Sequence, residues 1–345
     1  MIKPETIHKA PRSIIDSQGK PVFGQFDTIP HELDIERFDY RNVMDNPASR
    51  WQRYFHYKQF QFVSVVTADY VIGVAIADIR YLGSAFCYVY NINENSLEEQ
   101  SWLRPLSFDK VVTSSPHQGV THIARGQIQF KINQGDWTVE INTKLVQANL
   151  KLKVREDSQP LSMTTPTGYS GWTYTQKHNA LSVSGKLTVN NHEVELDYAL
   201  GGYDFSAGYM RRETSWRWAS INTHLLGESS KRIQLGMNLA AGVNETGTCE
   251  NALWIDGKKH LLPAVHFEFN RDDTAQPWQI YSEDRRIDLT FTPRNKRSEK
   301  LNFIVLKSNF RQFIGHFSGS IKDNNGVTHQ LEHVLGLTED HFACW

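Results

Sequence analysis

The chain has 345 residues, of which 39% are hydrophobic, 12% aromatic and 22% charged, and its formal net charge is −1. This composition excludes an intrinsically disordered chain, because burial of so much apolar surface can offset the entropy lost on folding. The balanced charge argues against a dedicated nucleic-acid-binding protein, which needs a basic surplus to neutralise phosphates.

The N-terminal segment MIKPETIHKAPRS has no apolar core of a secretory signal. No stretch of the sequence approaches the roughly 18 consecutive apolar residues of a membrane-spanning helix. The three cysteines, Cys87, Cys249 and Cys344, are far apart and form no CxxC motif. We therefore expect reduced thiols in a cytoplasmic protein that has no integral membrane segment.

Helix signals are few in the first third of the chain. The segment 47–56 is compatible with one or two helical turns, and a second short helix is predicted to begin at Ser96, whose spacing to Glu99 is that of a capping box, and to end before Pro105. Between them, the apolar stretches 57–67 and 70–79 are separated by a short polar break, which predicts a central β-hairpin.

Alternation of apolar and polar residues continues beyond this region. Asn133 to Asp136 predicts a hairpin turn, and the strand after it is predicted to run to Val154. The apolar positions of this strand change parity near Leu145, which predicts a β-bulge there, since one extra residue exchanges the two faces of a strand.

The second half of the chain has the same alternation. Asn190-Asn191, Asp256-Gly257 and Asn324 to Gly326 predict tight turns, because asparagine, aspartate and glycine tolerate positive φ. The alternating positions 194–200 predict the strand after the first of these turns. Further strands are predicted at 216–224, 232–241, 264–270, 286–292 and 301–306.

These elements predict an all-β protein built from two antiparallel barrel or sandwich halves with few short helices. The segment 158–168 concentrates Pro, Ser, Thr and Gly and lacks alternation. We therefore place a boundary between an N-terminal β unit, residues 1–160, and a C-terminal β unit, residues 161–345.

The most unusual segment is LGGYDFSAGYMRRETSWRWA at 200–219. Its glycines permit positive φ or close backbone approach, and Asp204 lies among them, at a predicted turn or bulge. Trp216 and Trp218 are two residues apart and therefore share one face of a strand. Arg217 points to the other face, toward Glu213 or another carboxylate.

The chain resembles the bacterial family known as domain of unknown function 2804, and the resemblance covers nearly the whole sequence. That family has no established function. The residues that carry the resemblance are Trp51 with Tyr54 and Phe55, Val71 to Asn91, Gly171 to Lys177, Asp204 to Ala219, Asn251 to His260 and the C-terminal GLTEDHFACW.

More distantly, Gly202, Asp204 and Gly208, followed by the tryptophan-rich strand, resemble the G…D-x-x-x-G…W-x-W pattern of carotenoid 1,2-hydratase-like proteins, relatives of tocopherol cyclases and fungal Diels–Alder cyclases. The resemblance implies two lipocalin-like β units side by side and an apolar isoprenoid or polyketide ligand. Phe205-Ser206-Ala207 stands where those proteins commonly have a His/Arg-rich string that contains tryptophan.

The hydratase-like resemblance implies an acid in an apolar pocket. A carboxyl group whose pKa is raised by burial can protonate an alkene, and aromatic faces can stabilise the carbocation that forms. Asp204 is the candidate catalytic acid. The alternative is that Asp204 caps a turn and that the tryptophans fill a core. The candidate ligand-binding residues are Tyr174, Lys177, Tyr209, Arg212, Trp216, Trp218 and Asp78.

Two of these candidates also have structural interpretations. Asp78 ends an apolar strand and can pair with Arg80 instead of facing a site. Lys177 follows the predicted strand 172–175 and is interpreted either as a surface lysine or as the partner of Asp204 or of a ligand carboxylate.

The histidines do not predict a metal centre. His329 with His333, and His260 with His266, lack the carboxylate or cysteine partners of a zinc site. No nucleotide-binding or hydrolase motif is found in the sequence. We expect neither a metal nor a cofactor.

Three functional hypotheses remain. The first is binding of a hydrophobic small molecule, a lipid or isoprenoid, in an aromatic-lined β pocket. The second is a cofactor-independent hydratase, isomerase or cyclase that uses Asp204 as general acid. The third is a ligand-free protein-interaction module, which predicts that no deep cavity exists. The oligomeric state is left open by the sequence.

Overall fold

The computed structural model describes residues 7–226, 232–242, 248–302 and 306–345. Within these ranges the chain is almost entirely β, and its helical segments are α1 (Arg50–His56) and the 3-10 turn η1 (Ile35–Arg37). Helix α1 begins with a capping box formed by Ser49 and Gln52, which satisfies backbone N–H groups that a helix start leaves without partners. The predicted all-β class is confirmed.

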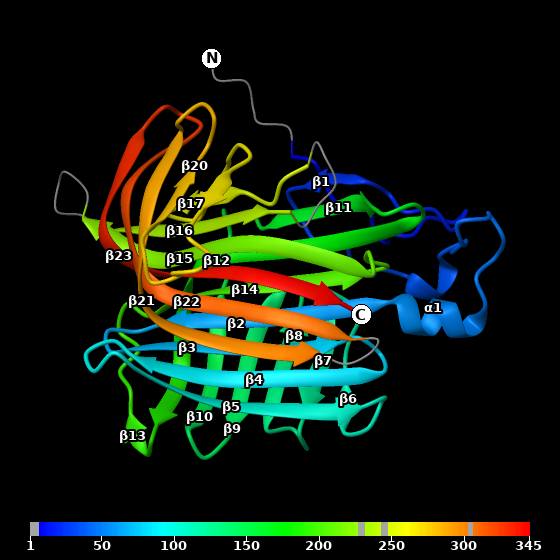
Figure 1. Ribbon diagram of the computed structural model, residues 1–345, viewed down its shortest axis with the longest axis horizontal. Coiled ribbons are helices and arrows are strands. Elements are labelled where there is room, and N and C mark those ends of the chain that lie inside the picture. Colours follow the sequence, from blue (N-terminus) through cyan, green and yellow to red (C-terminus); the bar gives the residue numbers. More distant parts are fainter. Residues whose placement is uncertain (1–6, 227–231, 243–247, 303–305) are drawn as a thin grey trace.

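The first sheet has 14 antiparallel strands and curls into a nearly closed barrel (Figure 1). Three short or flanking strands attach to it beside its main path: β1 (Gly24–Phe26), β11 (Leu161–Thr167) and β13 (His192–Glu193). In spatial order the main path is β5 (Ser96–Pro105), β4 (Leu82–Asn91), β3 (Tyr70–Asp78), β2 (Lys58–Val66), β14 (Leu200–Gly208), β12 (Gly171–Val189), β10 (Val146–Lys153), β9 (Asp136–Asn142), β8 (Ile128–Asn133), β7 (Gln118–Ile123) and β6 (Lys110–Val111).

The second sheet has nine antiparallel strands and forms a half-barrel beside the first (Figure 1). Its concave face holds a buried cluster that includes Trp278, Phe291 and Phe317. In spatial order the strands are β18 (Lys258–Leu261), β17 (Ala252–Ile255), β16 (Arg232–Ala241), β15 (Glu213–Leu226), β23 (Thr328–Cys344), β22 (Lys307–Lys322), β21 (Ile287–Asn302), β20 (Trp278–Tyr281) and β19 (His266–Glu268).

The two sheets meet through their outer faces. The interior of the first barrel is packed with its own core, which includes Trp137 and Trp172. A separate buried cluster joins the outer face of β2–β4 to β15, β16, β22 and β23, and Phe62 and Trp218 make an edge-to-face contact across it at 5.8 Å. Figure 1 shows the long orange and red strands lying against the blue and cyan ones at this contact.

The chain passes from the first sheet to the second between Gly208 and Glu213. This change of sheet does not coincide with the predicted boundary between residues 160 and 161, because β11, β12 and β14 pair with strands of the first sheet. The division into units 1–160 and 161–345 stays a prediction.

Most predicted turns are found where the residue types indicate them. Asn190 and Asn191 have φ of 48° and 65°, and Asp256 and Gly257 have φ of 48° and 86°, so both pairs adopt the left-handed conformation that tight hairpins require. The hairpins at 67–69, 134–135 and 323–327 are also present, between β2 and β3, β8 and β9, and β22 and β23.

Three local predictions were wrong. Residues 96–105 form strand β5 and not a helix, because they pair along their whole length with β4. The change of parity near Leu145 arises at a turn between two strands, β9 and β10, and not at a bulge in one strand. Residues 194–199 lie outside any strand, and β14 begins at Leu200.

Two later strand predictions are partly met. The predicted strand 264–270 is reduced to β19. Residues 301–302 end β21, while 303–305 lie outside the described residues.

Candidate functional site

A cavity of about 230 Å³ lies between the outer faces of the two sheets. We call it the inter-sheet cavity. Its walls are mostly apolar, and its charged residues include Lys177, Asp204, Glu250, Arg297 and Glu339. Apolar and aromatic residues on its walls include Phe60, Phe62, Ala75, Ala77, Phe86, Trp216, Trp218, Ala240 and Phe310.

The wall on the first sheet is a row of cross-strand neighbours. Partners in an antiparallel sheet point to the same face, so one residue from each of five adjacent strands reaches the cavity. From β12 to β4 this row is Lys177, Asp204, Phe62, Ala75 and Phe86. The row places a charged pair at one end and aromatic rings near the other, with a small side chain between the two phenylalanines.

Two rows of the second sheet form the opposite wall. The first row runs Trp218, Glu339, Gln312 and Arg297 over β15, β23, β22 and β21. The second row, two residues along each strand, is Trp216, His341, Phe310 and Glu299. The cavity is therefore enclosed by two sheets that each contribute both aromatic rings and ionisable groups.

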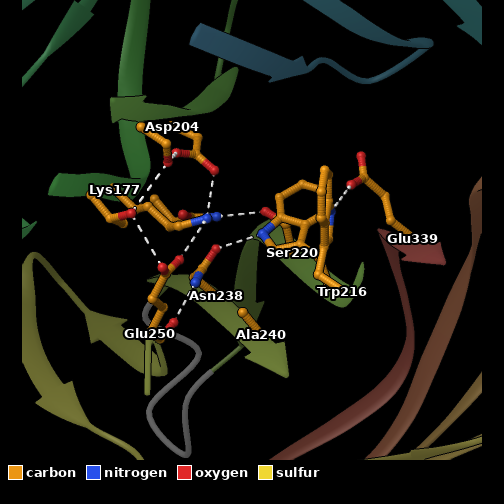
Figure 2. Close-up of polar contacts among 12 residues, drawn as sticks. Lys177, Asp204, Trp216, Ser220, Asn238, Ala240, Glu250 and Glu339 are labelled. Atoms are coloured by element: carbon orange, nitrogen blue, oxygen red, sulfur yellow. Dashed lines mark hydrogen bonds and ion pairs between the residues drawn. The ribbon is translucent and has the colours of Figure 1, made fainter. Parts of the chain in front are cut away.

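Lys177 is held between two carboxylates (Figure 2). Its Nζ lies 2.5 Å from Asp204 Oδ2 and 3.2 Å from Glu250 Oε2. Ser206 donates to Asp204 at 2.9 Å and Thr175 donates to Glu250 at 3.2 Å. Because Asp204 belongs to the first sheet and Glu250 precedes β17 of the second, this ion triad also joins the two sheets.

The environment of Lys177 keeps its amine protonated. Burial acts to lower the pKa of Lys177, but the charges and hydrogen bonds of Asp204 and Glu250 outweigh burial and raise it. The Lys177 ammonium lies 2.5 Å from Asp204 Oδ2, so this carboxyl group is engaged in an ion pair. The triad is suited to holding charge in place and not to acid catalysis.

Glu339 is a further carboxyl group at the cavity. Among the described residues, no cation lies within salt-bridge distance of it. It accepts hydrogen bonds from Trp216 Nε1 at 3.1 Å and from Gln312 Nε2 at 2.6 Å, and Figure 2 shows the indole nitrogen of Trp216 directed at it. Burial raises the pKa of Glu339, although both hydrogen bonds act in the opposite direction. Burial therefore favours the protonated form of Glu339.

His341 lies between two aromatic rings of the same wall. Its ring centroid is 4.2 Å from that of Trp216 and 4.9 Å from that of Phe310. Burial and the charge of Arg297 lower the pKa of His341 to about 3, so the imidazole is neutral at physiological pH. It contributes an aromatic face and not a charge.

Four predicted site residues, Asp204, Lys177, Trp216 and Trp218, line the inter-sheet cavity together. The interpretation of Lys177 as the partner of Asp204 is confirmed by their contact. Arg217, on the other face of β15, contacts Asp340 at 3.1 Å and not Glu213.

The other four candidates lie elsewhere. Tyr174 and Tyr209 belong to the core of the first barrel, where the Tyr174 hydroxyl contacts Ser162 and Gln176, and Arg212 is exposed. Asp78 is buried in an ion pair with Lys110 at 2.7 Å, and Arg80 lies at 3.5 Å, as its structural interpretation predicted. None of these four residues lines the inter-sheet cavity, although they lie close to the cavity residues in the sequence.

Glu250, Glu339 and Arg297 were not predicted. Glu250 lies outside any strand and has no local motif. Glu339 and His341 are two residues apart in the C-terminal segment GLTEDHFACW and therefore share one face of a strand. This spacing was the sequence signal that could have placed them together at a site. No sequence feature indicates that Arg297 approaches them.

The part of the chain that the structure describes offers neither a metal-binding cluster nor a membrane-spanning helix. Among the described residues, no group of three or more His, Cys, Asp or Glu side chains is arranged to hold a metal ion. In the same part of the chain, no helix has the length and hydropathy needed to cross a membrane.

Two solved structures have related folds. Kievitone hydratase from Nectria haematococca is 11% identical, with a TM-score of 0.47, over 84% of this chain and 88% of that one. A protein from Nitrosomonas europaea assigned as a candidate AttH is 10% identical, with a TM-score of 0.48, over 88% of this chain and 98% of that one. No curated protein matches the sequence.

The family relationship is clear from the sequence profile. The family described as a domain of unknown function, DUF2804, matches residues 5–345, which is nearly the whole chain. The predicted resemblance is thereby confirmed, and the chain belongs to the DUF2804 family.

Proposed function

We propose that the inter-sheet cavity binds a hydrophobic small molecule of the lipid or isoprenoid class. The observation that carries the proposal is the lining: aromatic and aliphatic side chains from both sheets surround a few buried ionisable groups. Ligand sites commonly combine an apolar wall with a small number of placed polar groups. The hypothesis of a ligand-free interaction module predicts that no deep cavity exists, so this cavity counts against it.

The size of the cavity limits the ligand. Its volume of about 230 Å³ is below the roughly 300–1,000 Å³ of sites for drug-sized molecules. It fits a molecule of about eight non-hydrogen atoms, given that a water molecule, with one such atom, occupies roughly 30 Å³ in the liquid. A longer chain can enter with one end, because Leu103, which also lines the cavity, is 47% exposed at its rim.

The first test is to fill the cavity. Ala75 is 1% exposed and lies between Phe62 and Phe86 in the lining row. We expect Ala75→Leu to lower ligand occupancy at least about tenfold, because the added carbons take up volume that the ligand needs. The measurement is mass spectrometry of the organic extract of purified protein from its native host, with thermal unfolding to verify that the variant folds.

Ala275→Leu is the matched control, since Ala275 is exposed and distant from the lining residues. It should leave both the extract and the melting temperature unchanged. Equal amounts of the same compound in extracts of the wild type and a folded Ala75→Leu variant would contradict binding in the inter-sheet cavity.

A second function, acid catalysis on the bound molecule, is favoured by one specific observation. Glu339 is a buried carboxyl with a raised pKa beside aromatic rings at the cavity. Its proton can add to a carbon–carbon double bond, which leaves a carbocation and the Glu339 carboxylate. Water can then add to the cation and return a proton to Glu339, or the cation can lose a proton to that carboxylate. Glu339 is better suited to this role than Asp204, because Asp204 is engaged in an ion pair with Lys177.

Deuterium exchange tests this second function without knowledge of the natural substrate. The purified protein is incubated in D₂O with 2-methyl-2-heptene, a trisubstituted alkene of suitable size. We expect deuterium in the recovered alkene or its hydration product with wild type, and at least about a hundredfold less with Glu339→Gln. Asp204→Asn should retain exchange if it folds, and loss of exchange only in folded Asp204→Asn would assign the acid to Asp204 instead.

A further inference from the structure

Arg297 connects the two sheets at the edge of the cavity. It projects from β21, is 4% exposed, and donates from Nε and Nη2 to the Glu99 carboxylate of β5 at 3.1 and 2.5 Å. Its guanidinium lies 3.7 Å from the ring centroid of Phe86 and 4.8 Å from that of Phe310. Glu99 and the two rings therefore hold the guanidinium in one orientation.

One edge of this guanidinium is not used by the protein. Nη1 of Arg297 is buried and has no hydrogen-bond partner among the described residues, although Arg297 lines the cavity. An arginine Nη1 carries two N–H donors, and a buried donor without an acceptor is costly. The unused edge is thus a preorganised donor on a residue that lines the cavity, next to the aromatic rings of Phe86 and Phe310.

The surrounding charges disfavour an anionic ligand at this edge. Glu99 already balances Arg297, and Asp204 and Glu250 outnumber Lys177. A ligand carboxylate would add a further negative charge to this set.

Glu299, an acidic residue on the same strand as Arg297, also lines the cavity, whereas Glu339 adds no negative charge while it holds a proton. The other two cations that line the cavity do not offset this excess of acidic residues. Lys58 donates to the backbone carbonyls of Phe55 and Ile79, and Lys307 is exposed to solvent.

We propose that the ligand is a neutral apolar molecule with one acceptor oxygen, of the ketone, ester or alcohol class, and that this oxygen accepts a hydrogen bond from Arg297 Nη1. The inference rests on the proposed binding function and specifies its ligand. The charge-assisted hydrogen bond supplies orientation, and the apolar remainder of the ligand lies among the aromatic side chains.

Four compounds of nearly equal size test the inference by isothermal titration calorimetry on the full chain at pH 7: ethylbenzene, acetophenone, 1-phenylethanol and benzoate. We expect acetophenone and 1-phenylethanol to bind about tenfold more tightly than ethylbenzene, because only they accept a hydrogen bond from Arg297. Benzoate should bind more weakly than acetophenone, because its charge is not balanced in the cavity.

Arg297→Lys assigns the effect to the unused edge. Lysine keeps a positive charge next to Glu99 but lacks the second donor edge, so acetophenone should lose its advantage over ethylbenzene while ethylbenzene binding changes less than about twofold. Arg217→Lys is the matched control, because Arg217 pairs with Asp340 outside the cavity and its replacement should preserve the advantage.

The outcomes separate this inference from the proposed function. Equal affinity of wild type for ethylbenzene and acetophenone would overturn the acceptor proposal and leave apolar binding in place. Tightest binding of benzoate would overturn it in favour of an anionic ligand. Absence of binding by all four compounds would contradict both the acceptor proposal and the proposed binding function.

Discussion

Replacement of Lys177 by methionine is expected to lower the free energy of unfolding by about 3–5 kcal/mol. The variant leaves Asp204 and Glu250 close to one another without the cation that both of them contact. Removal of one member of a buried ion cluster is costly because the remaining charges lose their compensation and stay away from water. Urea denaturation at pH 7 measures the effect.

Two further variants make this result specific to the triad. Lys131→Met removes one partner of the Lys131–Glu140 pair, which is substantially exposed, and should cost less than about 1 kcal/mol. Lys177→Met combined with Asp204→Asn and Glu250→Gln should recover most of the loss, because the neutral amides no longer need a cation. A loss below about 1 kcal/mol in Lys177→Met alone would contradict a stabilising role for the triad.

Acid is expected to destabilise the protein through His178. This side chain is 1% exposed, and its Nε2 lies 2.7 Å from Ser158 Oγ, which donates to the Gly257 carbonyl. The Ser158 hydroxyl therefore accepts from Nε2–H, and the buried Nδ1, which has no partner among the described residues, must take up any further proton. Burial, with a smaller effect of the Lys259 charge, lowers the pKa of His178 to about 3.

The direction of the pH effect follows from proton binding. Below pH 6.5 the unfolded chain protonates His178, whereas the folded chain does so only near pH 3. The unfolded state therefore binds more protons in this window, and the folded protein loses stability as the pH is lowered. Well below pH 6.5 each pH unit changes the unfolding free energy by about 1.4 kcal/mol, and because unfolded His178 is only half protonated at pH 6.5, the change between pH 6.5 and 4.5 is about 2 kcal/mol.

His178→Gln isolates this contribution. Glutamine can still donate to Ser158 but does not titrate, so the difference in unfolding free energy between wild type and variant should shift in favour of the variant by about 2 kcal/mol over those two pH units. His192→Gln, at an exposed position, should show no such shift. A pH-independent difference for His178→Gln would show that His178 also takes up its proton in the folded state.

The location of the cavity changes the interpretation of the unusual segment 200–219. The interior of the first barrel and the concave face of the second sheet hold packed cores, and the cavity lies between the two sheets. Asp204 faces this cavity, and it makes an ion pair with Lys177 there. The tryptophans of β15 line the opposite wall, so the segment contributes to both sides.

Much of the fold was predictable because its signals are local. The alternation of apolar and polar residues indicates strands directly, and turn residues such as Asn190 with Asn191 indicate hairpins through their tolerance of positive φ. Where a local signal competed with pairing, pairing prevailed: residues 96–105 carry a helix-start spacing but complete a ten-residue ladder with β4. Family membership is also a property of the sequence alone.

The sequence by itself therefore determined the all-β class, most hairpins, the family, and the association of Asp204, Lys177, Trp216 and Trp218 with one region. The tertiary structure alone decided that Glu250 forms an ion pair with Lys177 and that Glu339 and Arg297 line the same cavity. The physical reason is that side-chain direction alternates within each strand, while the register between strands and the packing of two sheets bring together residues far apart in the chain. No local sequence pattern predicts that the outer faces of these two sheets pack against each other.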